Sequence, residues 1–518
     1  MTKKRVRQIF WNALLLTAAS LLMRTVGVSF QVYISNRAGA EAMGLFSLMS
    51  GVYGFALTLA SAGIHLGVTR VVSEEIGAGH PERAGAVMRR ALLYAASIGL
   101  TVTVLLFALA EPIGIHWLKD ARTVRSLRLF GISLPLIAVS SALGGYFTAV
   151  RRTYKNAAVQ VLEQAVKIGA SMLLLAQAVA GDVEETCCAL VLGGTVAEIT
   201  SSLAQWLLYR LDRRRHLPRR SPSDGGALGA KLMKISLPIA MTAAIRSSLV
   251  TLQHVLIPEG LRKSGAAHAA ALSAYGSVHG MAMPIVLYPA ALIASFSSLL
   301  IPELAECRVK GHERHVRYII SRVWWLALLF SIGTAGILIC FSDEIGTALY
   351  PGTDTGRYLR LLAPLIPIMY VDTATDAMMK GLGEQVYSMN VNIADALISV
   401  ILAWILIPEF GIDGYLITIY FSEIFNTVLS ITHLLSIASP DVRLFKWVYK
   451  PLLCIVASTY TSRAVLERIP FHALPIWLTL TLHCAAVFAV YLLLLRLCGA
   501  IDREDTDWFG TLFKRGGP

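Results

Sequence analysis

The stretch "WNALLLTAASLLMRTVGVSFQVYI", Trp11–Ile34, decides the fold, because Arg24 is its only charged side chain. A run of about 20 predominantly apolar residues crosses the hydrocarbon core of a bilayer as a helix. A charge at that depth costs roughly 2.5 to 3.5 kcal/mol on insertion scales, so it persists where a partner or an aqueous cavity receives it. The stretch therefore predicts a membrane-spanning helix whose arginine faces a partner or an aqueous cavity.

The composition extends this prediction to the whole chain. Its 518 residues are 55% hydrophobic and 15% charged, and the mean hydropathy is +0.62, which leaves too little polar surface to cover a soluble globule. The formal net charge is +13, but the basic residues lie between apolar segments, where they set orientation and do not indicate nucleic-acid binding. The seven cysteines form no CxxC pair or metal-ligand spacing, so we expect no metal site.

Apolar segments predict an all-α polytopic membrane protein with about fourteen transmembrane helices. The first segment is too long for a cleaved signal peptide, so we count it as a span. The expected spans are 9–36, 45–73, 90–111, 128–150, 156–180, 186–210, 230–257, 269–301, 318–341, 358–381, 386–408, 412–437, 447–465 and 473–497.

Lysine and arginine gather on alternate connections, which predicts the orientation. The side that begins with Lys3 and Lys4 also receives the basic segments 83–90, 151–155, 212–220, 308–317 and 443–450. The other connections are poorer in basic residues and often acidic, as in "FSDEIGTALYPGTDTG" at 341–356. We therefore expect a multi-pass protein of the cytoplasmic membrane with both termini in the cytoplasm.

One connection departs from this pattern. The segment "HWLKDARTVRSLRLF", His116–Phe130, carries Lys119, Arg122, Arg125 and Arg128 on the expected outer side. We interpret it as an interfacial helix that leads into the fourth span. A miscounted span is the alternative.

A polar insert at 211–229, with Pro218 and Pro222, predicts a cytoplasmic linker between two halves. The first span of each half carries an arginine, in "LLLTAASLLMRTVG" and in "LPIAMTAAIRSSLV". Weak internal symmetry is typical of transporters, and six spans in each half predict a pseudo-two-fold axis along the membrane normal. The expected parts are an N-lobe at 1–210, the linker at 211–229, a C-lobe at 230–438, two further helices at 439–498 and a cytoplasmic tail at 499–518.

Arg24 and Arg246 are the main candidate site residues, because the repeat gives them similar depth on the first helix of each half. Two guanidinium groups across one cavity suit a diphosphate, since arginine stays charged and offers a planar fork of donors. The alternative is that each arginine pairs with acids of its own half. Those acids are Glu163 and Glu198 for Arg24, and Asp372, Asp376 and Asp395 for Arg246.

Other intramembrane polar groups have two interpretations each. Glu163 and Lys167 are spaced i,i+4 and form either an intrahelical pair or part of the substrate cavity. His65 is either a hydrogen-bonded bundle residue or a titrating one. A third set in the second half could bind Na⁺ or a proton, or could join helices by polar contacts. Its members are Asp372, Asp376, Asn392, Asp395 and Glu423.

No nucleophile elbow, P-loop or metal-ligand motif occurs in the sequence, which favours a protein other than an enzyme, with no organic cofactor. Arg70 precedes Glu74 by four residues, and this spacing predicts an ion pair on one helix face.

The segment Leu16–Glu75 resembles the opening of the stage V sporulation protein B family, within the polysaccharide transporter and lipid II flippase branch of the multidrug, oligosaccharidyl-lipid and polysaccharide exporter superfamily. The resemblance rests on Arg24, on "GAEAMGLF" at 39–46, on "TLASAGI" at 58–64 and on Glu74 and Glu75. The later "MMKGLGE" at 378–384 is similar to a Gly-Leu-Gly junction of the family.

The resemblance implies fourteen helices in two lobes, alternating access, and transport of an undecaprenyl-diphosphate-linked saccharide among the membrane lipids. It points to the peptidoglycan precursor lipid II, with the spore cortex as one destination. It also implies cavity arginines that hold the diphosphate, matched by Arg24 and Arg246, with His65 as the nearest candidate for a third contact. Two rivals stay open: a multidrug or cation antiporter of the same superfamily, and a scaffold that binds cell-wall synthases without transport.

Overall fold

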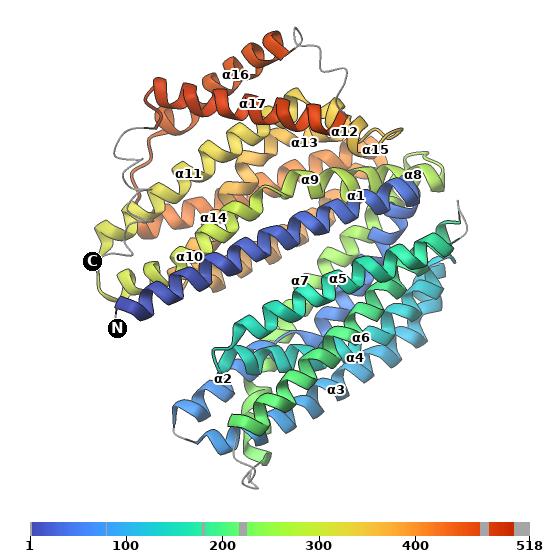
Figure 1. Cartoon of the computed structure of the whole chain (residues 1–518). Helices are drawn as coiled ribbons and strands as arrows, with labels where there is room; N and C mark the ends of the chain where they lie inside the picture. The colour runs from blue at the N-terminus through green and yellow to red at the C-terminus, as the bar shows by residue number, and fades with distance from the viewer. Residues whose placement is uncertain (1–2, 79, 179–181, 217–224, 467–475, 502–518) are drawn as a thin grey trace. The chain divides into compact units, whose positions relative to one another are not determined.

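The computed structural model describes residues 3–78, 80–178, 182–216, 225–466 and 476–501 (Figure 1). Within these ranges the chain forms helices joined by short turns, and no strand occurs. The first nine elements are α1 (Lys3–Ser61), α2 (Ile64–Gly77), α3 (Pro81–Pro112), η1 (Ile113–Trp117), α4 (Thr123–Ala149), α5 (Thr153–Gln177), α6 (Val183–His216), α7 (Gly225–Lys263) and α8 (His268–Tyr275). The remaining ones are η2 (Gly276–Ala282), α9 (Met283–Leu287), α10 (Ala290–Val309), α11 (Glu313–Cys340), α12 (Ser342–Leu349), α13 (Thr355–Leu362), η3 (Ala363–Leu365), α14 (Ile366–Gly381), α15 (Gln385–Ala438), η4 (Phe445–Tyr449), α16 (Lys450–Leu466) and α17 (Ile476–Leu497).

Ten helices in the described ranges are long and apolar enough to cross a membrane, or eleven if the bent pair 290–298 and 303–309 is one span. The chain is therefore an all-helical, multi-pass membrane protein. Two of the ten candidates, Leu22–Gly77 and Gln385–Ala438, have 56 and 54 residues, well beyond the roughly 20 that one span requires. The expected total of fourteen stays a prediction.

Each of the two very long helices is interrupted at a glycine. Gly39 in α1 has φ 80° and ψ 169°, and Gly411 in α15 has φ 58° and ψ −132°. A residue without a side chain adopts these backbone angles at little steric cost, whereas an L residue does not. Gly39 begins the segment "GAEAMGLF", so the motif marks the place where the chain turns out of its first span.

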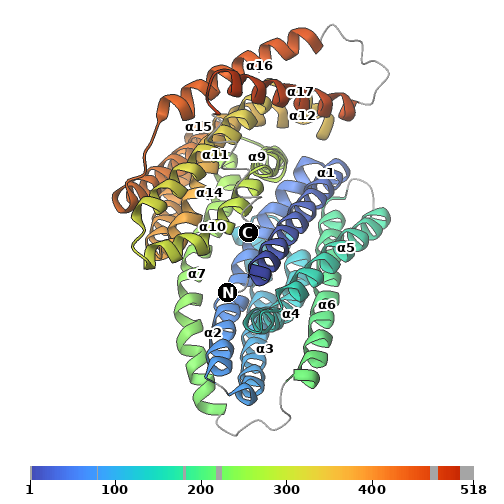
Figure 2. The same ribbon diagram turned by 60° about the vertical axis from the view of Figure 1, so that its left-hand side comes forward.

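The chain divides into two compact units. One unit comprises residues 41–276 with the short segment 403–408. In it α3 packs on α4, α5 on α6, and α4 on α6, while α7 lies against α2 and α3 (Figures 1 and 2). Its apolar core includes Val68, Val71 and Tyr146, each at most 1% exposed. Alanines in the same core, such as Ala91 and Ala142, let these helices approach closely.

The other unit comprises residues 1–40, 277–402 and 409–518. Here α14 packs on α10 and α11, and α16 lies against α11 and α17. Trp324 Nε1 donates to Thr375 Oγ1 at 3.0 Å, and Tyr370 OH donates to the carbonyl oxygen of Val286 at 2.8 Å. These bonds satisfy buried polar atoms between helices, which a bilayer cannot do.

The compact units do not coincide with the predicted lobes. The first span as far as Ala40 belongs to the unit of 277–402, and α7 and α8 belong to the unit of 41–276. The units reflect which helices lie close together, whereas the lobe boundaries at 210, 230 and 438 follow from the polar insert and the expected spans. The lobes and their axis stay predictions.

Helix occupies both described ends of the predicted linker at 211–229. α6 continues to His216 and α7 begins at Gly225, so helix extends into 211–229 from both ends. Arginine and leucine are good helix formers, and a polar segment that follows a span therefore continues the helix into water. Residues 217–224 of the linker and residues 502–518 of the tail lie outside the described part of the chain.

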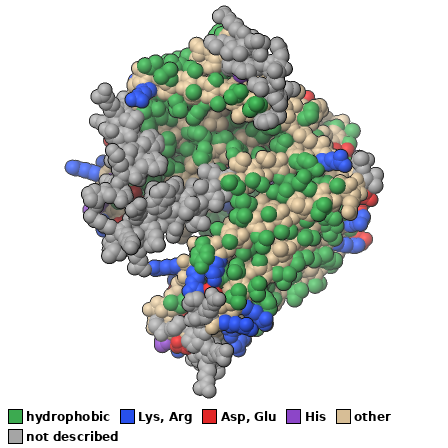
Figure 3. Space-filling model, viewed as in Figure 1, with side chains coloured by type: hydrophobic (Ala, Val, Ile, Leu, Met, Phe, Trp, Pro, Cys, Tyr) green, Lys and Arg blue, Asp and Glu red, His purple; other side chains and the backbone are tan. Residues whose placement is uncertain are grey.

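Hydrophobic side chains run along the described helices on the visible face, and Lys and Arg side chains gather in groups on it (Figure 3). On α3, Leu93, Leu100 and Val104 are 61%, 56% and 66% exposed. Large exposed apolar side chains on a helix of this length are typical of contact with lipid.

Candidate functional site

Arg24 lies in α1 and belongs to the unit of 277–402. Its Nη2 donates to the carbonyl oxygen of Leu287 at 3.0 Å, and the next residue, Thr25, shares a hydrogen bond of 2.7 Å with Tyr288 OH. Leu287 ends α9, where the last carbonyl groups of a helix lack partners and favour a nearby cation. A guanidinium has five N–H donors, so one carbonyl leaves most of them available.

The alternative ion pairs of Arg24 stay untested. Within its own unit no described carboxylate lies within 4.0 Å of its guanidinium, and the side chain is exposed. Glu163 and Glu198 belong to the other unit. The described contacts therefore leave Arg24 as a cation held by a helix end.

Arg246 lies in α7 and belongs to the unit of 41–276. Its side chain is exposed, and among the described residues it makes no hydrogen bond or ion pair. The acids that were its alternative partners, Asp372, Asp376 and Asp395, belong to the other unit. Because Arg24 and Arg246 fall in different units, their convergence on one ligand stays a prediction.

His65 lies at the start of α2 and faces α4. Its Nε2 and Thr148 Oγ1 share a hydrogen bond of 3.4 Å, and Asn156 Nδ2 lies 3.5 Å from the same hydroxyl. The side chain is half-buried. These contacts confirm a hydrogen-bonded bundle residue, and a role in substrate binding stays a prediction.

Glu163, Lys167 and Glu198 lie on α5 and α6 in the unit of 41–276. Ser201 Oγ donates to the main-chain carbonyl oxygen of Glu198 at 3.2 Å, and Lys167 interacts electrostatically with the carboxyls of Glu163 and Glu198. Tyr53 stacks on Phe130 at 4.1 Å and also interacts electrostatically with both acids. The structure thus brings Glu163 together with Lys167 and adds Glu198 and Tyr53 to the same polar group. Their part in substrate binding stays a prediction.

The five predicted cation-coupling residues lie on α14 and α15 in the unit of 277–402. Asp376 Oδ2 accepts from Lys380 Nζ at 2.5 Å, and Asp376 Oδ1 accepts from Ser388 Oγ. Asn392 Nδ2 donates to the carbonyl oxygen of Ser388 at 2.7 Å. Asp376 is therefore already neutralised by a lysine one turn away.

Three further acids, Asp372, Asp395 and Glu423, lie on the same two helices. Asp395 Oδ1 accepts from Ser422 Oγ at 2.7 Å, whereas Asp372 Oδ1 is buried and makes no hydrogen bond within the described structure. Glu423 interacts electrostatically with Asp372 and Asp395. Three carboxyls in one helix interface favour a bound cation or proton, because like charges in a low dielectric repel.

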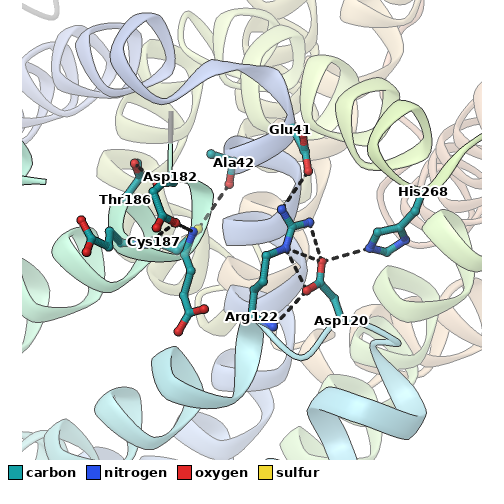
Figure 4. Close-up of polar contacts among 10 residues, drawn as sticks. Glu41, Ala42, Asp120, Arg122, Asp182, Thr186, Cys187 and His268 are labelled. Atoms are coloured by element: carbon teal, nitrogen blue, oxygen red, sulfur yellow. Dashed lines mark hydrogen bonds and ion pairs between the residues drawn. The ribbon is translucent and has the colours of Figure 1, made fainter. Parts of the chain in front are cut away.

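A third polar cluster was not predicted from the sequence (Figure 4). Asp120 lies in the turn between η1 and α4 and its side chain is 5% exposed. Arg122 donates two parallel hydrogen bonds to the Asp120 carboxylate, from Nε to Oδ1 at 3.0 Å and from Nη2 to Oδ2 at 2.7 Å. Arg122 Nη1 reaches Glu41 Oε1 at 3.0 Å, and His268 Nε2 lies 3.0 Å from Asp120 Oδ2.

This cluster joins three helices at one end of the unit of 41–276. Glu41 begins the second part of α1, Asp120 and Arg122 precede α4, and His268 begins α8. Burial by itself would raise the pKa of Asp120, but hydrogen bonds from Arg122 and His268 outweigh it and hold the pKa below its usual value. The Asp120 bond also raises the pKa of Arg122.

The predicted interfacial helix is not a separate element. α4 begins at Thr123, so Arg125 and Arg128 lie in its first turns, and the spans Glu82–Trp117 and Thr123–Ala149 follow one another directly. The pairing of Arg122 was missed because Glu41 and His268 are distant in sequence. The only local signal was the aspartate two residues before it.

Comparison with known proteins gives the same fold. The MatE family model matches residues 16–169 and 264–405, more than half of the chain. Stage V sporulation protein B of Bacillus subtilis (strain 168) is 24% identical over 500 residues, which cover 95% of this chain and 96% of that protein. This match confirms the resemblance drawn from Leu16–Glu75.

Two solved structures share the architecture. A structure of the lipid II flippase MurJ in an inward closed conformation superposes with a TM-score of 0.68 at 13% identity, covering 93% of this chain and 98% of that one. An inward-facing multidrug resistance transporter of the MATE family and MOP superfamily gives 0.62 at 15% identity, covering 82% and 96%. At these identities the likeness shows the fold alone.

Proposed function

The chain belongs to the MatE family, and on this premise we propose that it is a flippase for an undecaprenyl-diphosphate-linked saccharide. The substrate that we propose is the peptidoglycan precursor lipid II, moved across the cytoplasmic membrane by alternating access, with the spore cortex as one destination. A relative that covers 95% of the chain is a stage V sporulation protein, and a lipid II flippase shares the fold. Both termini would lie in the cytoplasm, as the basic connections predict.

One observation carries this proposal. Arg24 is a permanent cation in the first span, and its described partner is a main-chain carbonyl instead of a carboxylate. A cation without a counter-charge in a membrane protein attracts an anion, and guanidinium matches the geometry of phosphate oxygens. A diphosphate carried past Arg24 would supply the missing charge, with Arg246 as the second contact.

The test is translocation of labelled lipid II in proteoliposomes that contain the purified full-length protein. We expect Arg24→Ala to lower the rate by about tenfold or more, the factor that loss of a charge-assisted bond brings. Arg24→Lys keeps the charge without the planar fork of donors, so its rate should lie between those of the wild type and Arg24→Ala. Arg70→Ala is the matched control, because Arg70 pairs with Glu74 at 2.9 Å on an exposed face. Wild-type rates in Arg24→Ala would refute the proposal.

The coupling of transport to an ion is part of the same proposal. Asp372, Asp395 and Glu423 would take up Na⁺ or a proton during the cycle, since Asp372 Oδ1 has no hydrogen bond within the described structure. The described residues contain no group of three or more His, Cys, Asp or Glu side chains already arranged to hold a metal ion. Translocation of labelled lipid II measured under an imposed pH gradient and under an imposed Na⁺ gradient distinguishes a proton from Na⁺ as the coupling ion.

A multidrug or cation antiporter is the second candidate. The acids Glu163 and Glu198 on α5 and α6 favour it, because carboxylates suit cationic drugs. Resistance to cationic drugs, conferred by the wild-type chain and lost in Glu198→Gln without any loss of lipid II transport, would support this function. A scaffold for cell-wall synthases predicts instead that Arg24→Ala complements a flippase-depleted cell as well as the wild type does.

A further inference from the structure

The basic connection at 116–130 holds more positive charge than the expected outer side of a membrane protein usually carries. Two of its four cations are neutralised inside the unit of 41–276. Lys119 Nζ lies 2.5 Å from Glu259 Oε1, and Arg122 is held by Asp120 and Glu41. The two that remain, Arg125 and Arg128, project from the first turns of α4 and are exposed.

Arg125 and Arg128 line a groove of about 360 Å³ that lies wholly within this unit. The start of α6 contributes Glu184 to the groove, and its apolar wall includes Phe107 of α3 with Leu129 and Ile132 of α4. The volume falls within the range of small-ligand sites. The groove therefore combines both signs of charge with an apolar surface.

The charges in the groove are not joined to each other. Among the described residues, neither Arg125 nor Glu184 forms an ion pair within 4.0 Å. Arg128 Nη2 lies 3.5 Å from Glu111 Oε1, and both of these side chains are well exposed, so the pair is weak. A cation and an anion that line one groove without touching fit a ligand that carries both charges.

The apolar wall faces outward. Phe107 and Ile132 are 40% and 45% exposed, and Trp117 at the end of η1 is 60% exposed. Exposed tryptophan near the end of a span is typical of the membrane interface, where headgroups lie. A ligand here would have its polar part at the charges and its apolar part along the helices, which is the shape of a phospholipid.

We propose that this groove binds a phospholipid of the phosphatidylethanolamine class. The lipid phosphate would accept from Arg125 and Arg128, its ammonium would donate to Glu184, and an acyl chain would lie along Phe107, Leu129 and Ile132. Guanidinium and carboxylate give charge-assisted bonds to these two groups. None of these groove residues belongs to the transport site proposed above, so this inference stands apart from the transported substrate.

The test is native mass spectrometry of the purified full-length protein, titrated with phosphatidylethanolamine, phosphatidylcholine and phosphatidylglycerol of identical acyl chains. We expect the wild type to prefer phosphatidylethanolamine by about tenfold, since the quaternary ammonium of phosphatidylcholine donates no hydrogen bond and phosphatidylglycerol lacks the cation. Equal binding of all three lipids, or tighter binding of phosphatidylglycerol, would overturn the proposal.

Two variants separate the two ends of the headgroup. Arg125→Gln should weaken phosphatidylethanolamine binding by about tenfold, and Arg125→Lys should retain part of it. Glu184→Gln should abolish the preference over phosphatidylcholine and strengthen binding of phosphatidylglycerol, because the repelling carboxylate is gone. Arg89→Gln, an exposed arginine of α3, is the matched control and should bind as the wild type does. Unchanged binding in both Arg125→Gln and Glu184→Gln would contradict the assignment.

Discussion

Arg122 grips Asp120 with two parallel bonds, of 3.0 and 2.7 Å, while a third nitrogen of the same guanidinium reaches Glu41. One arginine thereby ties the turn before α4 to the start of the second part of α1. His268 extends the link to α8 through the same aspartate. The cluster therefore fixes three helices of one compact unit at one end.

Removal of Arg122 should destabilise this unit. Arg122→Gln leaves Asp120, 5% exposed, with a buried charge and without its bidentate partner. We expect a loss of about 2 kcal/mol, below the 3 to 5 kcal/mol of a fully buried pair because Arg122 is one-third exposed. The thermal midpoint of unfolding in detergent measures this loss of stability. Arg70→Gln breaks only an exposed ion pair and should shift the thermal midpoint little. An equal shift in both variants would show that the cluster contributes no more stability than an exposed ion pair.

The cluster should also make stability depend on acid. The folded pKa of Asp120 lies below the ordinary value of about 3.9, so its contribution is present above that value and is lost as the pH falls through the folded pKa. The wild-type thermal midpoint should therefore drop below about pH 4 more steeply than that of Asp120→Asn. Parallel curves for the two proteins would mean that Asp120 adds nothing in this range.

Gly44 should not tolerate a side chain. A Cβ placed on it would lie 1.9 Å from the carbonyl oxygen of Leu272 in α8, a backbone atom that cannot move aside alone. We expect Gly44→Ala to cost about 3 kcal/mol or to prevent folding, as overpacking does at its upper range. Gly54→Ala, in the same helix with nothing within 4 Å of the added carbon, is the control and should be neutral or slightly stabilising. Expression level and thermal midpoint in detergent report both variants.

The acids of α14 and α15 should differ in their effect on ion dependence. Glu423→Gln and Asp372→Asn should remove the stimulation of transport by an imposed gradient, because they would carry the coupling charge. Asp376→Asn should have a smaller effect, since Lys380 at 2.5 Å already neutralises Asp376. Transport of labelled lipid II with and without pH and Na⁺ gradients distinguishes these variants. Full gradient dependence in Glu423→Gln would exclude it as a coupling residue.

Local patterns in the sequence predicted several contacts correctly. The i,i+4 spacing of Arg70 and Glu74 gave an ion pair of 2.9 Å, and the placement of His65 gave a hydrogen-bonded bundle residue. The ion pair follows from helical geometry, which brings residues four apart onto one face, whereas the partner of His65 is Thr148 on another helix. The segment "GAEAMGLF" was recognisable as a motif, but its physical meaning, a kink at Gly39 and a close approach at Gly44, required the partner helix.

The sequence by itself determined that this chain is helical and lies in a membrane, because apolar runs of span length have no other stable structure in lipid or water. The tertiary structure alone decided which charges far apart in the sequence are neutralised. Asp120 meets His268 across 148 residues, whereas Arg24 finds a helix end instead of a carboxylate. Periodicity specifies the face on which a side chain lies, but the partner across that face depends on how distant helices pack, and packing is a property of the whole chain.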